Sequence, residues 1–188
     1  EAWNNDPEMD GYIVQLPLPS HIDEALVIRS ICPEKDVDGF TPENMGRLLT
    51  GDKGLLPATP LGIHTLLTAY EVPLRGCECV IIGDNNIVGR PLANLFSHLG
   101  ITVTLCHEAT LNLRDHCLRA DIIVTALGES LAPDSPFVLT ADMVKPGCVV
   151  IDSDIRRTPS GLCGAVDFAN VAPLCSYITP VPGGVGPM

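Results

Sequence analysis

Four short segments of the chain combine residue types that bind ligands with a backbone that a ligand can approach. They are residues 14–19 (VQLPLP), 35–40 (KDVDGF), 83–89 (GDNNIVG) and 178–188 (ITPVPGGVGPM). In the last segment, three prolines fix φ and remove hydrogen-bond donors, and three glycines leave the backbone bare. Such a segment neither continues as a helix nor packs as a central strand. It is suited to line a ligand site, although its composition alone also fits a flexible linker.

The segment 83–89 is placed where a dinucleotide would bind. It falls between an expected strand at 79–82 and an expected helix at 88–99. Bare backbone at a helix N-terminus can receive a pyrophosphate. The spacing departs from the common Gly-x-Gly-x-x-Gly, because Asn85 occupies the second glycine position and the final glycine comes one residue late. A tight glycine turn in any α/β fold explains the segment equally well.

Glu108 follows the next expected strand, Thr102–Cys106. It comes about 20 to 25 residues after the glycine turn, where an acidic residue commonly accepts a hydrogen bond from the ribose 2'-hydroxyl of NAD. A solvated charge at the end of a strand is the alternative. Asp36 and Asp38 stand before Gly39, and an Asp-x-Asp pair before glycine is usually part of a turn.

Apolar runs alternate with amphipathic stretches at the spacing of repeated β/α units. This pattern predicts an α/β fold with a parallel, doubly wound, Rossmann-like sheet over residues 61–188, preceded by residues 1–60 as part of a second α/β domain. The expected strands are 11–16, 79–82, 102–106, 121–126 and 148–152. The expected helices are 22–31, 59–69 with Thr59 as N-cap and Pro60 in the first turn, 88–99 and 113–119.

Composition excludes several classes of partner. The chain has 188 residues, of which 46% are hydrophobic and 18% charged, so a packed core is expected. The formal net charge of -12 and only 11 scattered lysines and arginines argue against binding to nucleic acid or an anionic membrane. The eight cysteines include no Cys-x-x-Cys pair, which favours buried, reduced thiols in a reducing compartment over a metal site.

The order of the four segments resembles the methylenetetrahydrofolate dehydrogenase/methenyltetrahydrofolate cyclohydrolase family over essentially the whole chain. The resemblance implies that residues 1–60 are the C-terminal part of a folate-binding catalytic domain and that residues 61–188 bind NAD(P). It implies that Asp38 accepts hydrogen bonds from the pterin and that Gln15 orients the general acid/base at the one-carbon bridge, so both are catalytic candidates. The other implied substrate-binding residues are Val14, Leu16, Pro182, Gly183 and Gly186.

For the cofactor, the resemblance implies contacts from Gly83, Asp84, Asn85, Ile87 and Glu108, with Ile155 beside the nicotinamide ring. NADP is the family's usual cofactor. In this chain, however, Asp84 replaces an arginine and Glu108 replaces a serine that hold the 2'-phosphate, so both contacts become acidic. That change favours NAD, or loss of cofactor binding. Asp154 also replaces a glycine beside the expected nicotinamide position, and Ala165 replaces an aspartate.

The family's general acid/base is a lysine in a Tyr-x-x-x-Lys motif upstream of the VQLP segment. Lys35, Lys53 and Lys145 are the lysines of this chain, and none stands in such a motif. We therefore expect a fragment that lacks the N-terminal segment with this lysine and a C-terminal helix. The chain alone is expected to be inactive.

The expected function is one-carbon folate metabolism. The enzyme would oxidise 5,10-methylenetetrahydrofolate with NAD(P) and hydrolyse 5,10-methenyltetrahydrofolate to 10-formyltetrahydrofolate. A non-catalytic paralogue or assembly subunit with a decayed cofactor site is the alternative, and an unrelated NAD dehydrogenase is a third. The expected partners are tetrahydrofolate derivatives, a dinucleotide and a second copy of the chain. The resemblance implies a cytoplasmic location, with mitochondria as the other option.

Overall fold

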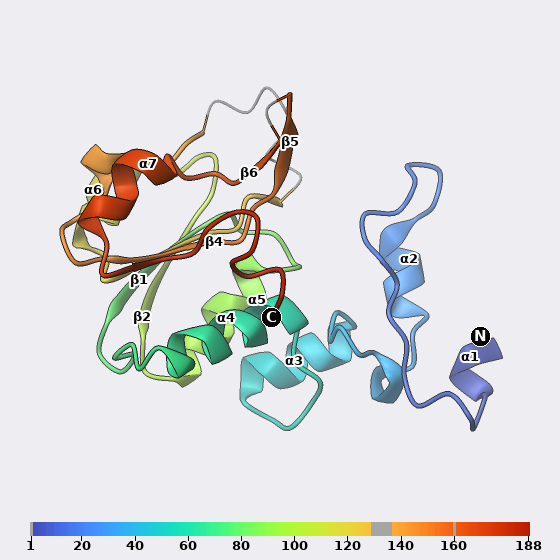
Figure 1. Ribbon diagram of the computed structural model, residues 1–188. Coiled ribbons are helices and arrows are strands. Elements are labelled where there is room, and N and C mark those ends of the chain that lie inside the picture. The colour runs from blue at the N-terminus through green and yellow to red at the C-terminus, as the bar shows by residue number, and fades with distance from the viewer. Residues whose placement is uncertain (1, 129–136, 160) are drawn as a thin grey trace.

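The computed structural model describes residues 2–128, 137–159 and 161–188 (Figure 1). Its α-helices are α1 (Ala2–Asn5), α2 (Glu24–Arg29), α3 (Pro42–Thr50), α4 (Ala58–Ala69), α5 (Gly89–His98), α6 (Leu113–Arg119) and α7 (Phe168–Val171). Short 3-10 helices are η1 (Pro33–Lys35), η3 (Ala141–Met143) and η4 (Ala172–Leu174). The strands are β1 (Glu78–Ile82), β2 (Thr102–Cys106), β3 (Ile122–Thr125), β4 (Val149–Asp152), β5 (Arg156–Thr158), β6 (Gly161–Cys163) and β7 (Tyr177–Ile178).

Five strands form one parallel sheet in the order β2-β1-β3-β4-β7. The first strand lies inside the sheet, where Val80 is opposite Thr104 on one side and Ile123 on the other. The chain therefore leaves β1 toward one edge through α5 and β2, and returns to the other side of β1 through α6 and β3. This is the predicted doubly wound arrangement, and its topological switch point lies between β1 and β3.

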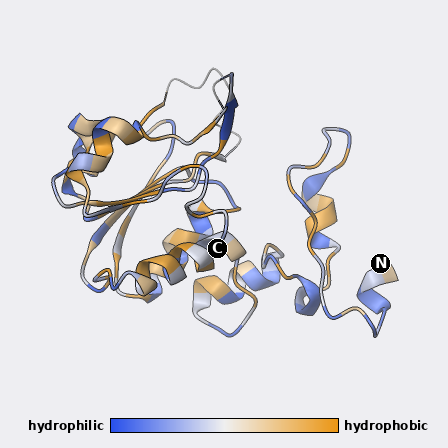
Figure 2. Cartoon of the chain, viewed as in Figure 1, coloured by the Kyte–Doolittle hydropathy of each residue, from blue (hydrophilic) through white to orange (hydrophobic). Residues whose placement is uncertain are grey.

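Successive residues of a strand point to opposite faces of the sheet, and both faces are covered by helices. In Figure 1, α6 and α7 lie above the sheet, and α4 and α5 lie below it. Figure 2 shows much of the hydrophobic colour on the strands and on α4. One core cluster joins Ile81, Val124 and Ile151 to Ile63, Leu67, Leu92 and Phe96. The other joins Val80, Ile123 and Val150 to Cys117 and Val171. Each of these large apolar side chains contributes roughly 1.5–3 kcal/mol by burial.

The N-terminal part of the chain lies beside the sheet and is connected to it through α3 (Figure 1). The contact between α3 and α5 includes a hydrogen bond in which His98 Nε2 donates to the Leu48 carbonyl oxygen at 2.9 Å. Thr41 begins α3 by accepting a hydrogen bond from Asn44 N, and Gly51 ends it in the left-handed conformation. Helix α5 of the sheet domain thus contacts the C-terminal end of α3 through a polar interaction.

The strand predicted at 11–16 is wrong. In the described part of the chain, this segment pairs only through a single bridge between Tyr12 and Asp36, and Ile13 and Gln15 are exposed. The neighbour of Tyr12 is the turn-rich loop that contains η1, so a ladder cannot extend. Pro17 then removes a donor that a longer strand would need.

The helix expected from Thr59 begins one residue earlier, at Ala58, and Pro57 precedes it as the N-cap. Leu61 N makes the first helical hydrogen bond to the Pro57 carbonyl oxygen at 3.0 Å. Pro60 therefore occupies the first turn, where a helix does not need its N–H. Helix α3 was not predicted, although Thr41 and Pro42 repeat the same start pattern.

None of the eight cysteines forms a disulfide, and Cys79, Cys106, Cys117 and Cys148 are buried. Burial raises the pKa of both Cys117 and Cys148 to about 12, so these thiols stay protonated. Within residues 2–128, 137–159 and 161–188, the structure contains no helix long and apolar enough to cross a membrane.

Candidate functional site

The turn between β1 and α5 has a backbone that only glycine permits at two positions. Gly83 has φ +118°, and a Cβ atom there would overlap the carbonyl oxygen of Ala126 at the end of β3. A Cβ atom on Gly89 would overlap the carbonyl oxygen of Gly83 itself. The turn is therefore folded tightly on itself at the switch point of the sheet, where dinucleotides bind in folds of this kind.

Asn85 fixes this turn with both ends of its side-chain amide. Its Oδ1 accepts hydrogen bonds from Ile87 N at 3.0 Å and Val88 N at 2.8 Å, at the start of α5. Its Nδ2 donates to the Ala126 carbonyl oxygen across the switch point. Asn85 thus holds the turn against the β3 loop. These bonds give a physical reason for an asparagine at the position of the second glycine of the common motif.

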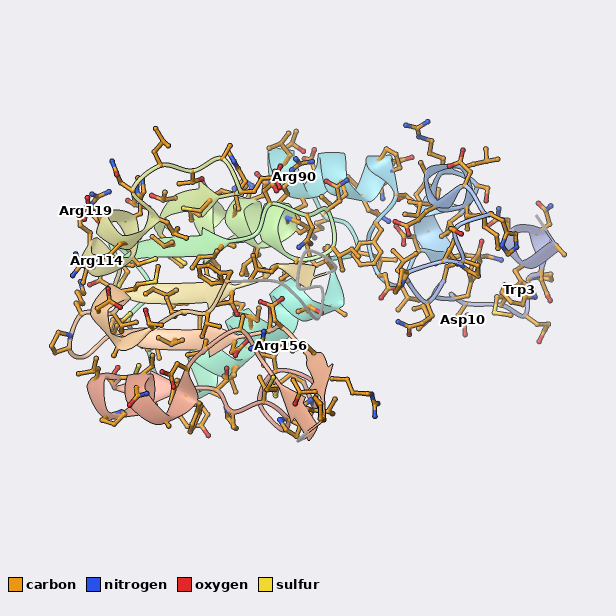
Figure 3. All side chains as sticks on the ribbon, turned by 90° about the horizontal axis from the view of Figure 1, so that it is seen from above. Trp3, Asp10, Arg90, Arg114, Arg119 and Arg156 are labelled. Carbon is orange, nitrogen blue, oxygen red and sulfur yellow. The ribbon has the colours of Figure 1, made fainter. Side chains whose placement is uncertain are left out.

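Asp84 forms an ion pair with Arg90, which lies in the first turn of α5. Arg90 Nη2 is 3.0 Å from Asp84 Oδ2, and Arg90 Nη1 donates to Asn86 Oδ1 at 2.9 Å. Figure 3 shows Arg90 toward the N-terminal part of the chain, whereas Arg114 and Arg119 lie at the opposite end of the sheet. Asp84 was predicted to make the 2'-phosphate contact acidic, and the structure places the cation of Arg90 against its carboxylate.

Glu108 lies two residues beyond β2 and is exposed. In this parallel sheet, β1 and β2 end at the same edge, with Ile82 paired to Cys106. The Asp84 and Glu108 segments therefore leave the sheet at the same edge, as a site for the adenosine end of a dinucleotide requires.

A cavity of about 540 Å³ opens beyond the carboxyl end of β4. Four of the predicted site residues line this cavity, namely Ile155, Pro182, Gly183 and Gly186. The rest of its lining comes from other residues of the segment 180–188, from the start of α4 and from the end of β4, where Asp152, Ser153 and Asp154 follow one another. Its volume lies within the range of about 300–1,000 Å³ that small-molecule sites usually have.

Residues 178–188, called the Pro/Gly segment below, are attached to β4 through Thr179. Thr179 N donates to the Val150 carbonyl oxygen at 3.1 Å, and Thr179 Oγ1 accepts from Asp152 N at 2.8 Å. Farther along, a Cβ atom on Gly184 would lie 2.5 Å from the Pro180 carbonyl oxygen, so the segment folds back on its own start. Residues 180–184 line the cavity, so in the structure this part of the segment forms a wall and not a free linker.

Asp152 organises the end of β4, and the sequence analysis did not assign it a role. The residue is only 4% exposed, yet its carboxylate accepts from Thr125 Oγ1 at 2.9 Å, Ala165 N at 3.2 Å and Val166 N at 3.1 Å. A Cβ atom on Gly164 would overlap this carboxylate. Asp152 thus connects β3, β4 and the chain after β6. The sequence signal that could have identified this role is an aspartate directly after the apolar run 148–151.

Asp154 is a second buried carboxyl group in the wall of the same cavity, with 3% exposure. Its Oδ1 accepts from Gly128 N at 2.8 Å, whereas Oδ2 is buried without a hydrogen-bond partner among the described residues. Burial, with a smaller contribution from the charge of Asp152, raises the pKa of Asp154 above its ordinary value. The position predicted to face nicotinamide therefore holds a carboxyl group that is only partly satisfied.

On the N-terminal side, the bridge between Tyr12 and Asp36 places the segment with Gln15 next to the loop with Asp38. Asp36 is buried and has a structural role, because its Oδ2 accepts from Thr41 N at 2.8 Å and Asn44 Nδ2 at 3.0 Å. Asp38 is half-buried, and burial together with the charge of Asp36 raises its pKa. Of the two aspartates, Asp38 is thus the one left available to a ligand.

A second cavity of about 330 Å³ brings Leu16 of the N-terminal part together with Ile87 of the glycine turn. Val14, Gln15, Asp38, Asp84 and Glu108 line neither this cavity nor the larger one. None of the three lysines lines the larger cavity either. Lys35 Nζ donates to the Trp3 and Asp6 carbonyl oxygens, and Lys145 pairs with Asp121 at 2.6 Å.

The fold and the glycine turn at its switch point define a Rossmann-like dinucleotide-binding protein, and comparison with known proteins narrows the class. Residues 57–188 match the family model for the tetrahydrofolate dehydrogenase/cyclohydrolase NAD(P)-binding domain, and residues 1–38 match the catalytic domain of the same family. The chain belongs to the tetrahydrofolate dehydrogenase/cyclohydrolase family.

Individual relatives agree with this assignment. The bifunctional protein FolD of Porphyromonas gingivalis is 52% identical over 98% of this chain and 64% of the relative. The crystal structure of the bifunctional enzyme FolD from Campylobacter jejuni is similar with a TM-score of 0.92 and 48% identity, over 99% of this chain and 64% of that one. A FolD structure from Trypanosoma brucei, complexed with NADP cofactor and inhibitor, is 34% identical with a TM-score of 0.88, over 99% and 64%. The chain thus spans somewhat less than two thirds of these relatives.

Proposed function

We propose that the protein oxidises 5,10-methylenetetrahydrofolate with a nicotinamide dinucleotide and hydrolyses the methenyl product to 10-formyltetrahydrofolate. The observation that carries the proposal is the cavity of about 540 Å³ at the carboxyl end of β4, walled by the Pro/Gly segment and Ile155. A cavity at the carboxyl ends of parallel strands is where ligands of this fold class bind. Membership of the tetrahydrofolate dehydrogenase/cyclohydrolase family supplies the chemistry.

In this proposal, residues 61–188 bind the dinucleotide and residues 1–60 contribute folate contacts. The glycine turn with Gly83 and Asn85 receives the pyrophosphate at the start of α5, where the positive end of the helix dipole lies. Asp38 holds the pterin, and Gln15 lies near the one-carbon bridge beside Val14 and Leu16. The dinucleotide supplies a hydride acceptor, while the chain positions the two planar ligands.

We propose NAD rather than NADP as the cofactor. Glu108 is exposed at the edge of the sheet where the adenosine ribose would lie, and a carboxylate there accepts from a ribose 2'-hydroxyl but repels a 2'-phosphate. The ion pair between Asp84 and Arg90 reduces the contribution of Asp84 to that preference. A homodimer and a cytoplasmic location complete the proposal, and both depend on the resemblance to the family.

The experiment is to supply the purified full-length protein, because residues 1–188 alone are expected to be inactive, with 5,10-methylenetetrahydrofolate and either NAD or NADP, and to follow formation of reduced cofactor. Hydrolysis of 5,10-methenyltetrahydrofolate is followed separately, because it needs no dinucleotide. We expect reduction of NAD that depends on folate. Binding of folate and dinucleotide without either reaction would favour a non-catalytic paralogue, and binding of neither ligand would refute the proposed site.

A further inference from the structure

Asp154 and Asp152 are buried carboxyl groups at the end of the same strand, yet their surroundings differ. Asp152 uses both oxygens, since Oδ1 accepts from Thr125 Oγ1 and Oδ2 accepts from Val166 N. Asp154 uses Oδ1 toward Gly128 N, and its Oδ2 has no hydrogen-bond partner in the part of the chain that the structure describes. A buried carboxylate without a compensating partner is costly, whereas one with several donors is stable.

A purely structural role does not account for Asp154. Its hydrogen bond from Gly128 N at 2.8 Å needs a single acceptor, which a serine or asparagine would also supply. The Leu127 backbone and the Thr125 hydroxyl also act to lower the pKa of Asp154, but burial outweighs them. No salt bridge within the described residues involves Asp154. The nearest basic residue along the chain, Arg156, donates from Nε to Cys163 Sγ at 3.1 Å. The negative charge of Asp152 adds to the unfavourable surroundings. The site therefore lacks a positive charge.

The position of Asp154 indicates where that charge would come from. Asp154 lines the cavity of about 540 Å³ together with Ile155 and the Pro/Gly segment. Its hydrogen bond to Gly128 also places it beside the end of β3, at the switch point where the Asn85 amide contacts Ala126. A dinucleotide whose pyrophosphate lies on the glycine turn extends along these strand ends. Its oxidised nicotinamide ring carries a positive charge, and its reduced ring is neutral.

We propose that Asp154 is a specificity-determining residue of the dinucleotide site, which favours the oxidised, cationic nicotinamide ring over the reduced, neutral ring. The inference depends on the proposed function. In the reaction, a hydride with its two electrons leaves the methylene bridge and joins the ring. The ring becomes neutral and the folate becomes a methenyl cation, so the total charge in the cavity does not change. Asp154 therefore acts on the exchange of cofactor, when one dinucleotide is bound alone.

The size of the effect follows from the interaction of two charges. At a separation of about 6 Å and an effective dielectric constant near 20, the attraction corresponds to roughly a hundredfold preference, and partial protonation or water reduces it to about tenfold. Direct contact is not needed, because the attraction falls only slowly over such distances. We thus expect the wild-type protein to bind NAD more tightly than NADH. This preference for NAD should be smaller in the Asp154→Asn variant.

The test is to measure the dissociation constants of NAD and NADH by calorimetry for the wild type and for Asp154→Asn. The asparagine keeps the acceptor for Gly128 N and removes the charge. The ratio of the NADH to the NAD dissociation constant should fall by about tenfold or more in the variant. Asp142→Asn is the matched control, because Asp142 is an exposed carboxylate that pairs with Arg114 away from the cavity, and this change should leave the ratio unaltered.

Asp154→Ser provides a second variant if the asparagine disturbs folding, since a hydroxyl group can also accept from Gly128 N. An unchanged ratio in a folded Asp154 variant that still binds both dinucleotides would refute the inference and leave the proposed function intact. A wild-type protein that binds neither dinucleotide would overturn both. A fall in the ratio together with absent folate oxidation would support the inference about the cofactor while contradicting the proposed reaction.

Discussion

Arg90 reaches back from α5 to Asp84 in the glycine turn, with Nη2 3.0 Å from Oδ2. The two residues are six positions apart, and the tight turn between them brings their charges together. The pair compensates the acidic residue that replaces an arginine of the family. In the proposed cofactor site, repulsion of a 2'-phosphate would therefore depend mainly on Glu108, and the two acidic departures from the family pattern would not be equivalent.

We predict that Glu108→Ser raises the affinity for NADP by about tenfold and changes the affinity for NAD much less. The replacement removes an exposed negative charge from the expected position of the 2'-phosphate, where solvent and salt weaken the repulsion without abolishing it. Titration with both dinucleotides at two salt concentrations measures the effect, which should shrink as the salt increases. A gain in NADP affinity that does not depend on salt would argue against electrostatic repulsion.

A second prediction concerns the ion pair itself. Arg90→Ala should lower the affinity for NADP several-fold, because it leaves Asp84 uncompensated and removes the nearby cation. The affinity for NAD, which lacks the phosphate, should change little. Arg114→Ala is the control, since Arg114 forms a similar exposed pair with Asp142. If Arg90→Ala weakened NAD and NADP equally, Arg90 would have to act on a part common to both, such as the pyrophosphate.

The two aspartates of the N-terminal loop should respond in opposite ways. Asp38→Ala is expected to weaken folate binding by about 1.5–3 kcal/mol, the loss of charge-assisted hydrogen bonds, with little change in stability. Asp36→Ala is expected to lower the free energy of unfolding by about 2 kcal/mol, because it leaves the buried Thr41 N–H and Asn44 amide without their acceptor. Calorimetry with a folate and unfolding in urea separate the outcomes. Equal loss of stability in both variants would make Asp38 a structural turn residue.

Two glycine-to-alanine changes should alter stability with opposite signs. Gly89→Ala is expected to lower the free energy of unfolding by at least about 2 kcal/mol, because the new methyl group overlaps the Gly83 carbonyl oxygen. Gly46→Ala, within α3 and with open space around the added atom, should raise it by about 0.5–1 kcal/mol. Urea unfolding measures both. A Gly89→Ala variant as stable as the wild type would show that the turn can open without cost.

The raised pKa of Asp154 predicts a specific dependence of stability on pH. A carboxyl group whose pKa is higher in the folded than in the unfolded chain contributes stability below its ordinary value of 3.8, and this contribution is lost as the pH rises through the folded-state value. The free energy of unfolding of Asp154→Asn, relative to that of the wild type, should therefore increase as the pH rises from about 4 to about 7. Urea unfolding at the two pH values checks this. A difference between variant and wild type that stays constant with pH would contradict the prediction.

The sequence was most informative where local patterns and tertiary structure agree. The strand Thr102–Cys106 and the helix Leu113–Arg119 were predicted with their observed bounds, because an apolar run followed by an amphipathic stretch has few other solutions in an α/β chain. The prediction of a buried strand at 11–16 was wrong because the segment has no partner strand among the described residues, which hydrophobicity cannot reveal. The hairpin of β5 and β6 was not predicted, since its three-residue strands are too short for a periodic signal.

At the site, sequence reasoning identified positions but not interactions. Gly183 was predicted in the wall between folate and nicotinamide and Ile155 beside the nicotinamide ring, and both line one cavity of the structure. The ion pair of Asp84 with Arg90 was not predicted, because its geometry depends on how the turn folds. The role of Asp152 depends on donors from residues 125, 165 and 166, which become neighbours only when the sheet forms. The roles proposed for Gln15 and Asp38 stay predictions.

Thr179 fastens the Pro/Gly segment to the Asp152 backbone, and this attachment has a consequence for the entropy of binding. Ordering one residue of a mobile loop costs roughly 1–2 kcal/mol, so a wall that closed only around its ligand would weaken binding considerably. Here the prolines restrict the unfolded chain, and the hydrogen bonds of Thr179 order the segment when the sheet forms. A ligand entering the cavity therefore meets a surface that is already in place, and its association should require little adaptation of the backbone.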